Sequence, residues 1–115
     1  MQKTILLDLA NETVRRYGEL PPDFADKMAK RIGRKFSMKV EVQEVSELGF
    51  HYKEIYSYAK SIFREYLKPP KDIYADPRDV DGEHFLDRLV QKFPEDDGDI
   101  LSKISSWVIY YEYLR

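Results

Sequence analysis

The chain has 115 residues, 43% of them hydrophobic, which is enough to bury the core of a single domain spanning residues 1–115. The absence of cysteine excludes a disulfide framework, thiolate metal sites and a cysteine nucleophile, and it favours a cytoplasmic location. The net charge of -2 is unevenly spread, because residues 1–68 hold 13 Lys and Arg against 10 Asp and Glu, whereas residues 69–115 hold 6 against 11. No apolar run is long enough to span a bilayer, and the first residues carry Asp8 and Glu12, so we expect neither a membrane span nor a signal peptide.

Two helices are predicted in the first third of the chain. Apolar residues at helical spacing indicate the first helix over residues 3–17, where Gly18 provides a stop signal. The second helix begins after two prolines, with Asp23 as its cap and Asp26 in the position of a capping-box acid. Its apolar stripe is formed by Ala25, Met28, Ala29, Ile32 and Phe36.

The next segment is predicted to be a short β-strand near residues 36–43. Its apolar residues alternate with polar ones, which is the pattern of a half-buried strand. Such a strand needs a partner, either residues 71–76 in a two-stranded ribbon or the same strand of a second chain. The alternative is one long central helix over residues 42–67, but Gly49 lies on its apolar stripe, so we expect the helix to begin near residue 50.

Three further helices complete the prediction. A broad apolar face indicates a helix over residues 51–67, which the following prolines end. A shorter helix is expected over residues 82–93, and a last one over residues 98–115 with Asp97 or Asp99 as its cap. The last helix is apolar on more than one side, so it is either central or docked against another molecule. The predicted fold is therefore mainly α, with about five helices and one short strand.

The acidic loop YADPRDVDGEHF, residues 74–85, invites comparison with a calcium loop. If Gly82 takes the sixth position of an EF-hand loop, Pro77 falls at the first and Arg88 at the twelfth, where a bidentate carboxylate belongs. We therefore expect no metal site and no cofactor. Instead, Asp79 or Asp81 is expected to cap the following helix, with Glu83 in its first turn.

Catalytic patterns are weak in this chain. Only His51 and His84 are available as histidine bases, and no motif marks a nucleophile beside them. Ser57 and Lys60 match the Ser-x-x-Lys spacing of a serine acyl-transfer site, but its companion motifs are missing. The sequence therefore favours a protein that is not an enzyme, with His51 or His84 beside a carboxylate as the enzymatic alternative.

Two segments resemble parts of known families. DIYADPRD, residues 72–79, followed by a predicted helix resembles the loop of nuclease-colicin immunity proteins. SKISSWVIYYEYL, residues 102–114, resembles the last helix of acyl carrier proteins, but the Asp-Ser attachment site of that family is missing because Asp81 precedes Gly82. Neither resemblance transfers a function to this chain.

The predicted function is binding to another protein, in an adaptor, inhibitor or immunity-type role. Aromatic residues dominate binding energy at interfaces, and an acidic surface steers basic partners, so the partner is expected to be a basic protein or a second copy of the chain. The residues expected at this contact are Trp107, Tyr110, Tyr113, Asp76, Asp79, Asp81, Asp96 and Asp97.

Nucleic-acid binding is the main alternative function. The polar face of the second predicted helix is basic, and no acidic residue occurs from residue 27 to residue 39. Such a face can lie along phosphates, although the acidic second part of the chain would repel them. The residues of this alternative are Lys27, Lys30, Arg31, Arg34 and Lys35.

Overall fold

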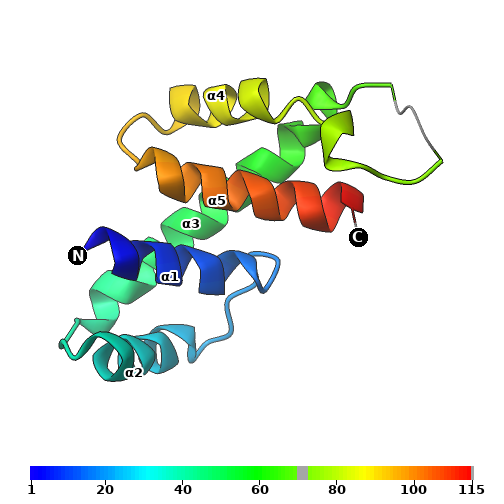
Figure 1. Cartoon of the computed structure of the whole chain (residues 1–115). Coiled ribbons are helices and arrows are strands. Elements are labelled where there is room, and N and C mark those ends of the chain that lie inside the picture. Colours follow the sequence, from blue (N-terminus) through cyan, green and yellow to red (C-terminus); the bar gives the residue numbers. More distant parts are fainter. Residues whose placement is uncertain (70–72, 115) are drawn as a thin grey trace. The chain divides into compact units, whose positions relative to one another are not determined.

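A computed structural model describes residues 1–69 and 73–114 of the chain. The α-helices are α1 (Lys3–Val14), α2 (Phe24–Phe36), α3 (Val42–Ile62), α4 (Gly82–Lys92) and α5 (Gly98–Ile109), as Figure 1 shows. Two 3-10 helices, η1 (Phe63–Tyr66) and η2 (Pro77–Asp79), and a π-helix, η3 (Tyr110–Leu114), complete the elements. The prediction of a mainly α fold with about five helices is confirmed.

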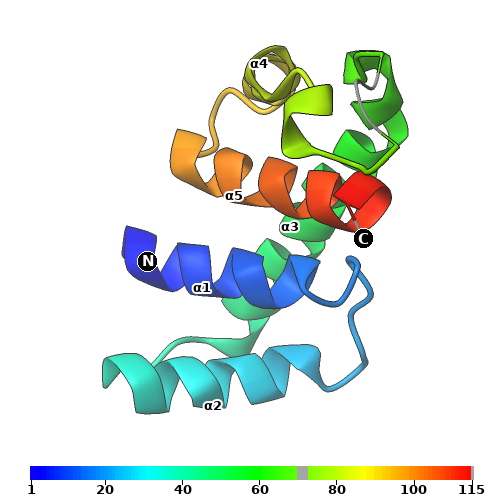
Figure 2. The ribbon, with the colours of Figure 1, turned by 45° about the vertical axis from the view of Figure 1, so that its right-hand side comes forward.

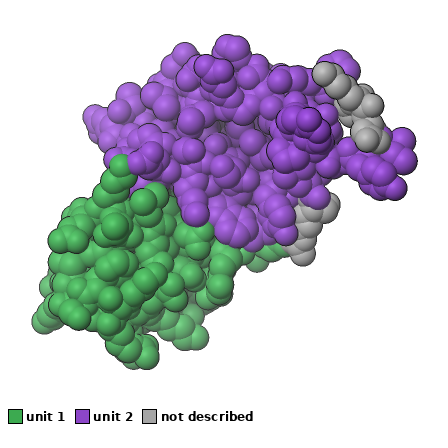
Figure 3. Space-filling view, in the orientation of Figure 1, with its two compact units in different colours: residues 1–54 green, residues 55–115 purple. Residues whose placement is uncertain are grey.

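The chain divides into two compact units, unit 1 (Met1–Glu54) and unit 2 (Ile55–Arg115), which Figure 3 shows in green and purple. Helix α3 belongs to both, since its residues up to Glu54 lie in unit 1 and the rest lie in unit 2. Because one continuous helix links the two cores, the expected single domain stays a prediction that unfolding experiments can test.

Unit 1 contains α1, α2 and the first part of α3, and α1 lies beside α2 in both ribbon views (Figures 1 and 2). Helix α1 ends at Val14, earlier than predicted, because the chain turns through Tyr17 and Gly18, whose φ angles are 59° and 73°. The Gly18 N–H donates to the Thr13 carbonyl (3.3 Å), which closes the helix through a left-handed residue. The buried apolar residues of this unit are Ile5, Leu9, Ala10, Val14, Phe24, Met28, Ile32, Val45 and Tyr52.

The predicted strand over residues 36–43 is wrong. Ser37 ends α2 in a left-handed conformation (φ 52°), residues 38–41 have no regular structure, and α3 begins at Val42. The alternating residues are not buried on one face, since Met38 and Val42 are 37% and 42% exposed. Residues 73–76, part of the suggested partner strand, form no strand either, and residues 71–72 lie outside the described residues. A pattern of alternating apolar and polar residues stabilises a β-strand only when the apolar face is buried, and this segment has no such face.

The long central helix, the rejected alternative, is close to what the structure contains. Helix α3 runs from Val42 to Ile62, and η1 continues it to Tyr66. Gly49 lies inside this helix without breaking it. The ring of Phe24 approaches the helix backbone at this position. A Cβ at Gly49 would lie 3.1 Å from Cε1 of the Phe24 ring, so the glycine serves close packing.

Unit 2 contains the end of α3 together with α4, α5 and the short helices, and α4 packs against both α5 and η1. As expected, Asp81 caps α4 by accepting a hydrogen bond from the His84 N–H, and Asp97 caps α5 by accepting one from the Asp99 N–H. Leu67 and Val80 form an isolated antiparallel bridge. The buried apolar residues of this unit are Ile55, Tyr56, Ala59, Ile62, Phe63, Val80, Phe85, Leu89, Phe93, Ile100, Leu101, Ile104 and Val108.

Candidate functional site

Three aromatic rings gather at the C-terminal end of α5, and we call Trp107, Tyr110 and Tyr111 the aromatic cluster. The rings of Trp107 and Tyr111 stack at 5.0 Å between centroids with 19° between their planes. Tyr110 meets Trp107 edge to face at 5.9 Å and Tyr111 at 5.3 Å. Tyr110 is 48% exposed, and the other two are half-buried. The cluster therefore presents a rigid aromatic surface, wet on one side and packed on the other.

The cluster stands where α5 changes into the π-helix η3. Residues at helical spacings of three and four share one face, which brings Trp107 together with Tyr110 and Tyr111. Ile104 and Val108, which neighbour these rings on α5, are fully buried in the core of unit 2 and anchor this part of the helix. Sequence reasoning missed Tyr111, although its spacing of four from Trp107 could have revealed it.

Tyr113 has a different position from the one that its sequence neighbours suggest. Its hydroxyl donates to Oδ2 of Asp79 (2.7 Å), and Asp79 is only 6% exposed. This hydrogen bond raises the pKa of Tyr113, because losing the phenol proton would place two negative charges together. Tyr113 thus ties the chain end to the acidic loop, and the structure does not bring its hydroxyl to the aromatic cluster.

The carboxylates of the acidic loop have partners within the chain. Asp76 caps η2 by accepting the Arg78 N–H (2.8 Å), and its carboxylate pairs with the guanidinium of Arg78 (2.6 Å). The side-chain hydrogen bond from Arg78 lowers the pKa of Asp76 to about 2. Asp79 also accepts the backbone N–H of Asp76 (3.1 Å), which closes a capping box. The loop is therefore organised by its own hydrogen bonds.

The second acidic segment, residues 95–99, leads into the first turn of α5. Asp97 is its helix cap, and the Asp96 N–H donates to the Phe93 carbonyl (3.1 Å). Asp97 and Asp99 lie at the N-terminal end of α5, where their charge favours the helix dipole. The aromatic cluster is at the opposite end of the same helix, so the structure does not unite Asp96 and Asp97 with Trp107 and Tyr110.

The two histidines lie in different surroundings. Nδ1 of His84 lies 2.6 Å from Oδ2 of Asp81, and the His84 side chain is 70% exposed. The hydrogen bond with Asp81 raises the pKa of His84, and the same bond lowers the pKa of Asp81. His51 lies beside the ring of Tyr52 (5.8 Å between centroids). The His84–Asp81 pair is a solvent-exposed contact at the start of α4, where water reaches both side chains.

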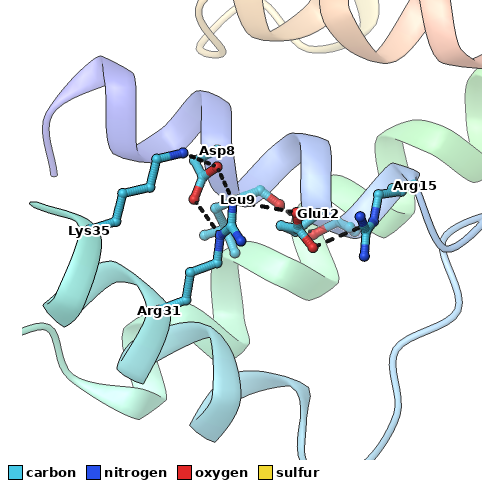
Figure 4. Close-up of polar contacts among 7 residues, drawn as sticks. Asp8, Leu9, Glu12, Arg15, Arg31 and Lys35 are labelled. Carbon is cyan, nitrogen blue, oxygen red and sulfur yellow. Dashed lines mark hydrogen bonds and ion pairs between the residues drawn. The ribbon is translucent and has the colours of Figure 1, made fainter.

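The basic face of α2 is partly neutralised by α1. Figure 4 shows Arg31 and Lys35 reaching Asp8, with distances of 3.1 Å from Arg31 Nε and 3.1 Å from Lys35 Nζ to the carboxylate. Partial burial alone would raise the pKa of Asp8, but the hydrogen bonds and charges of the two cations lower it. Glu12, buried beside them, lies 3.7 Å from Arg31 and 3.6 Å from Arg15.

The remaining basic residues of α2 differ in their pairing. Lys27 pairs with Asp23 (2.9 Å), which occupies the N-cap position of α2 without accepting a capping hydrogen bond. The predicted capping box of Asp23 and Asp26 is therefore absent. Lys30 and Arg34 are exposed and have no ion-pair partner in the part of the chain that the structure describes. Arg34 borders a hollow of about 440 Å³ that Arg31 and Lys35 also line.

The described residues contain neither a cluster of metal-binding side chains nor a helix that could span a membrane. Among residues 1–69 and 73–114, no group of three or more His, Cys, Asp or Glu side chains is placed to hold a metal ion. In the same residues, every helix is too short or too polar to cross a bilayer.

Comparison of the chain with protein-family models, with curated proteins and with solved structures gave no match.

Proposed function

We propose that this chain is a non-enzymatic binding protein that holds a partner protein on the aromatic cluster of α5 and η3. The observation that carries the proposal is the half-exposed arrangement of Trp107, Tyr110 and Tyr111, three rings in mutual contact on a helix anchored in the core. Rigid aromatic side chains bury a large area at a small cost in conformational entropy, which makes Trp and Tyr the usual anchors of interfaces.

The charge of unit 2 indicates the kind of partner. Residues 55–115 hold 9 Lys and Arg against 12 Asp and Glu. An acidic surface accelerates encounter with a basic partner, and the acceleration weakens with salt. We therefore favour a basic protein partner over a second copy of this chain, and the absence of cysteine favours a cytoplasmic setting. An inhibitor, immunity-type or adaptor role would all use such a contact.

The test is affinity capture from a lysate of the source with the wild type, Tyr110→Ala and Tyr74→Ala. Tyr74 is 74% exposed and lies outside the cluster, so it is a matched control for loss of an exposed phenol. We expect Tyr110→Ala to reduce capture of the partner at least about tenfold, as for an interface anchor, and Tyr74→Ala to leave it unchanged. Sedimentation of each variant separates self-association from capture. Equal capture and equal self-association in all three proteins would contradict the proposal.

Nucleic-acid binding through α2 is a second candidate, supported by Lys30 and Arg34, which are exposed and lack ion pairs among the described residues. If it is correct, affinity for RNA or DNA falls steeply with salt and weakens when both side chains are replaced by alanine. Lys53→Ala, at an exposed lysine of α3, is the control for the change in charge. A gel-shift titration at two salt concentrations decides the question.

A further inference from the structure

A second cluster in unit 2 joins the end of α3 and η1 to α4. The guanidinium of Arg88 donates from Nε to the hydroxyl of Tyr58 (3.1 Å) and from Nη1 to the hydroxyl of Tyr66 (3.2 Å). A carboxylate within ion-pair distance belongs to Glu65, whose Oε2 lies 3.9 Å from Nη1 and whose side chain is 61% exposed. Arg88 is thus held mainly by neutral acceptors, although arginine normally pairs with a carboxylate or a phosphate.

The hydrogen-bond roles leave donors to spare. A phenol that accepts a hydrogen bond from arginine keeps its own O–H proton, and a guanidinium has five N–H donors. Within the described residues, the O–H groups of Tyr58 and Tyr66 have no acceptor. Two phenol donors and the remaining N–H groups of Arg88 therefore lie together, with the Glu65 carboxylate 3.9 Å from Nη1 of Arg88.

The cluster is rigid and electropositive in an otherwise acidic unit. The rings of Tyr58 and Phe93 pack edge to face (5.7 Å between centroids), and the ring of Tyr66 packs against the ring of Phe85 (5.6 Å). Lys92, one turn after Arg88 on α4, places Nζ 5.5 Å from the centre of the Tyr58 ring. Arg88 and Lys92 thus both contact Tyr58, Arg88 at its hydroxyl and Lys92 over its ring, so two cations and two phenols occur in the same part of unit 2.

We propose that Arg88, Tyr58 and Tyr66, assisted by Lys92, bind a phosphate group. Phosphate is favoured over a carboxylate because it carries more charge and more acceptor oxygens, which match several donors that point from different side chains. Glu65 is the group that phosphate displaces, since its carboxylate lies at the limit of an ion pair with Arg88. The site uses no residue of the aromatic cluster, so it stands or fails independently of the proposed function.

The experiment follows the Arg88 Nε–H resonance of the full-length protein by NMR during titration with inorganic phosphate, at constant ionic strength set with chloride. We expect a saturable shift with a Kd on the order of 1 mM, typical of a weak single site. A parallel titration with methyl phosphate distinguishes the source, because tighter binding of the ester indicates a phosphate carried on a larger molecule. A titration with acetate should give a Kd at least about tenfold higher, because acetate has a single charge and fewer acceptor oxygens.

Variants separate the proposed site from a purely structural arginine. Glu65→Gln removes the competing carboxylate at an exposed position and should lower the Kd about threefold or more. Tyr58→Phe and Tyr66→Phe should each raise it several-fold, whereas Lys103→Ala, a charge-matched control for Lys92→Ala, should leave it unchanged. A shift that stays linear with phosphate, or a Kd that Glu65→Gln and both Tyr→Phe variants leave unaltered, would overturn the proposal. Circular dichroism verifies that each variant is folded.

Discussion

Unit 1 and unit 2 differ in how they satisfy their polar side chains. In unit 1, Asp8 and Glu12 of α1 meet Arg31 and Lys35 of α2, so cations and carboxylates face one another. In unit 2, Arg88 donates to two neutral phenols, and the buried hydroxyl of Tyr56 has no hydrogen-bond partner among the described residues. When the charged side chains of a network pair with one another, their contribution to stability is a sufficient reason for their presence. A network with unused donors leaves room for a ligand.

This difference also changes the weight of the charged residues. Three of the five basic residues of α2 have carboxylate partners within the chain, which reduces the charge that α2 offers to phosphates. Arg88 lies in the acidic unit, and its two hydrogen-bond acceptors are neutral phenols, which do not neutralise the charge of the guanidinium. Pairing matters more than the number of charges in a sequence segment.

The largest expected change in unfolding free energy comes from substitutions in the two cores, which test whether the two units unfold cooperatively. Leu9 and Leu89 are fully buried, one in each unit, and replacement of either by alanine should cost about 2–5 kcal/mol of unfolding free energy. Because α3 runs through both units, we expect both variants to unfold in one transition. Urea unfolding followed by far-UV circular dichroism and by Trp107 fluorescence measures this directly.

Val90→Ala is the control for Leu89→Ala, because Val90 follows Leu89 on α4 but is 43% exposed. Its unfolding free energy should change by no more than about 0.5 kcal/mol. Two separate transitions, with Trp107 fluorescence insensitive to Leu9→Ala, would show that the units unfold independently and that the single-domain prediction is wrong.

The next effect tests the closed network of unit 1. Asp8→Asn removes the carboxylate that serves Arg31 and Lys35, and it should cost about 1–3 kcal/mol at neutral pH. Because the pKa of Asp8 is lowered from 3.8, its contribution is present above pH 3.8 and is lost as the pH falls through the lower native value. The unfolding free energy of the variant, measured from pH 7 to pH 2, should lack this acid-dependent loss.

Glu54→Gln provides the control, since Glu54 is an exposed carboxylate of α3. The loss of stability in acid should be the same in this variant as in the wild type. If Asp8→Asn also retains the full acid-dependent loss, the ion pairs of Asp8 contribute nothing to folding and the contrast between the units disappears.

The smallest effect compares two phenols of unit 2. Tyr113→Phe removes a hydrogen bond to buried Asp79 and should cost about 1–2 kcal/mol. Tyr56→Phe removes a buried hydroxyl without a partner and should change stability by less than about 0.5 kcal/mol or increase it. Thermal and urea unfolding at pH 7 measure both, and equal costs for the two substitutions would contradict the hydrogen-bond assignment.

Alkaline pH sharpens the same comparison. Burial, together with the charge of nearby Glu112, raises the pKa of Tyr56 to about 12 from 10.0. The unfolded chain therefore releases this proton first, and wild-type stability should fall as the pH rises from 10 through about 12. Tyr56→Phe should show a smaller fall over that range.

The helices that the sequence identified are those whose signals are local. The helices α2, α4 and α5 were predicted from their apolar spacing, and the caps Asp81 and Asp97 were each one of two predicted candidates, because periodicity and capping act within a few residues. Trp107, Tyr110 and Tyr113 could be named as candidates from their places on the last predicted helix, whereas Tyr111 was missed. Their division into a cluster around Trp107 and a tether at Tyr113 could not be predicted in this way.

Tertiary structure decided everything that depends on residues far apart in the chain. Phe24 packs against Gly49 inside α3, a contact between residues 25 positions apart, and the alternation that predicted a strand has no buried face and no partner strand in the described part of the chain. Tyr113 meets Asp79 across 34 residues, and Arg88 meets Tyr58 across 30. Side-chain pairing at such separations depends on how the helices pack, which local propensity does not encode.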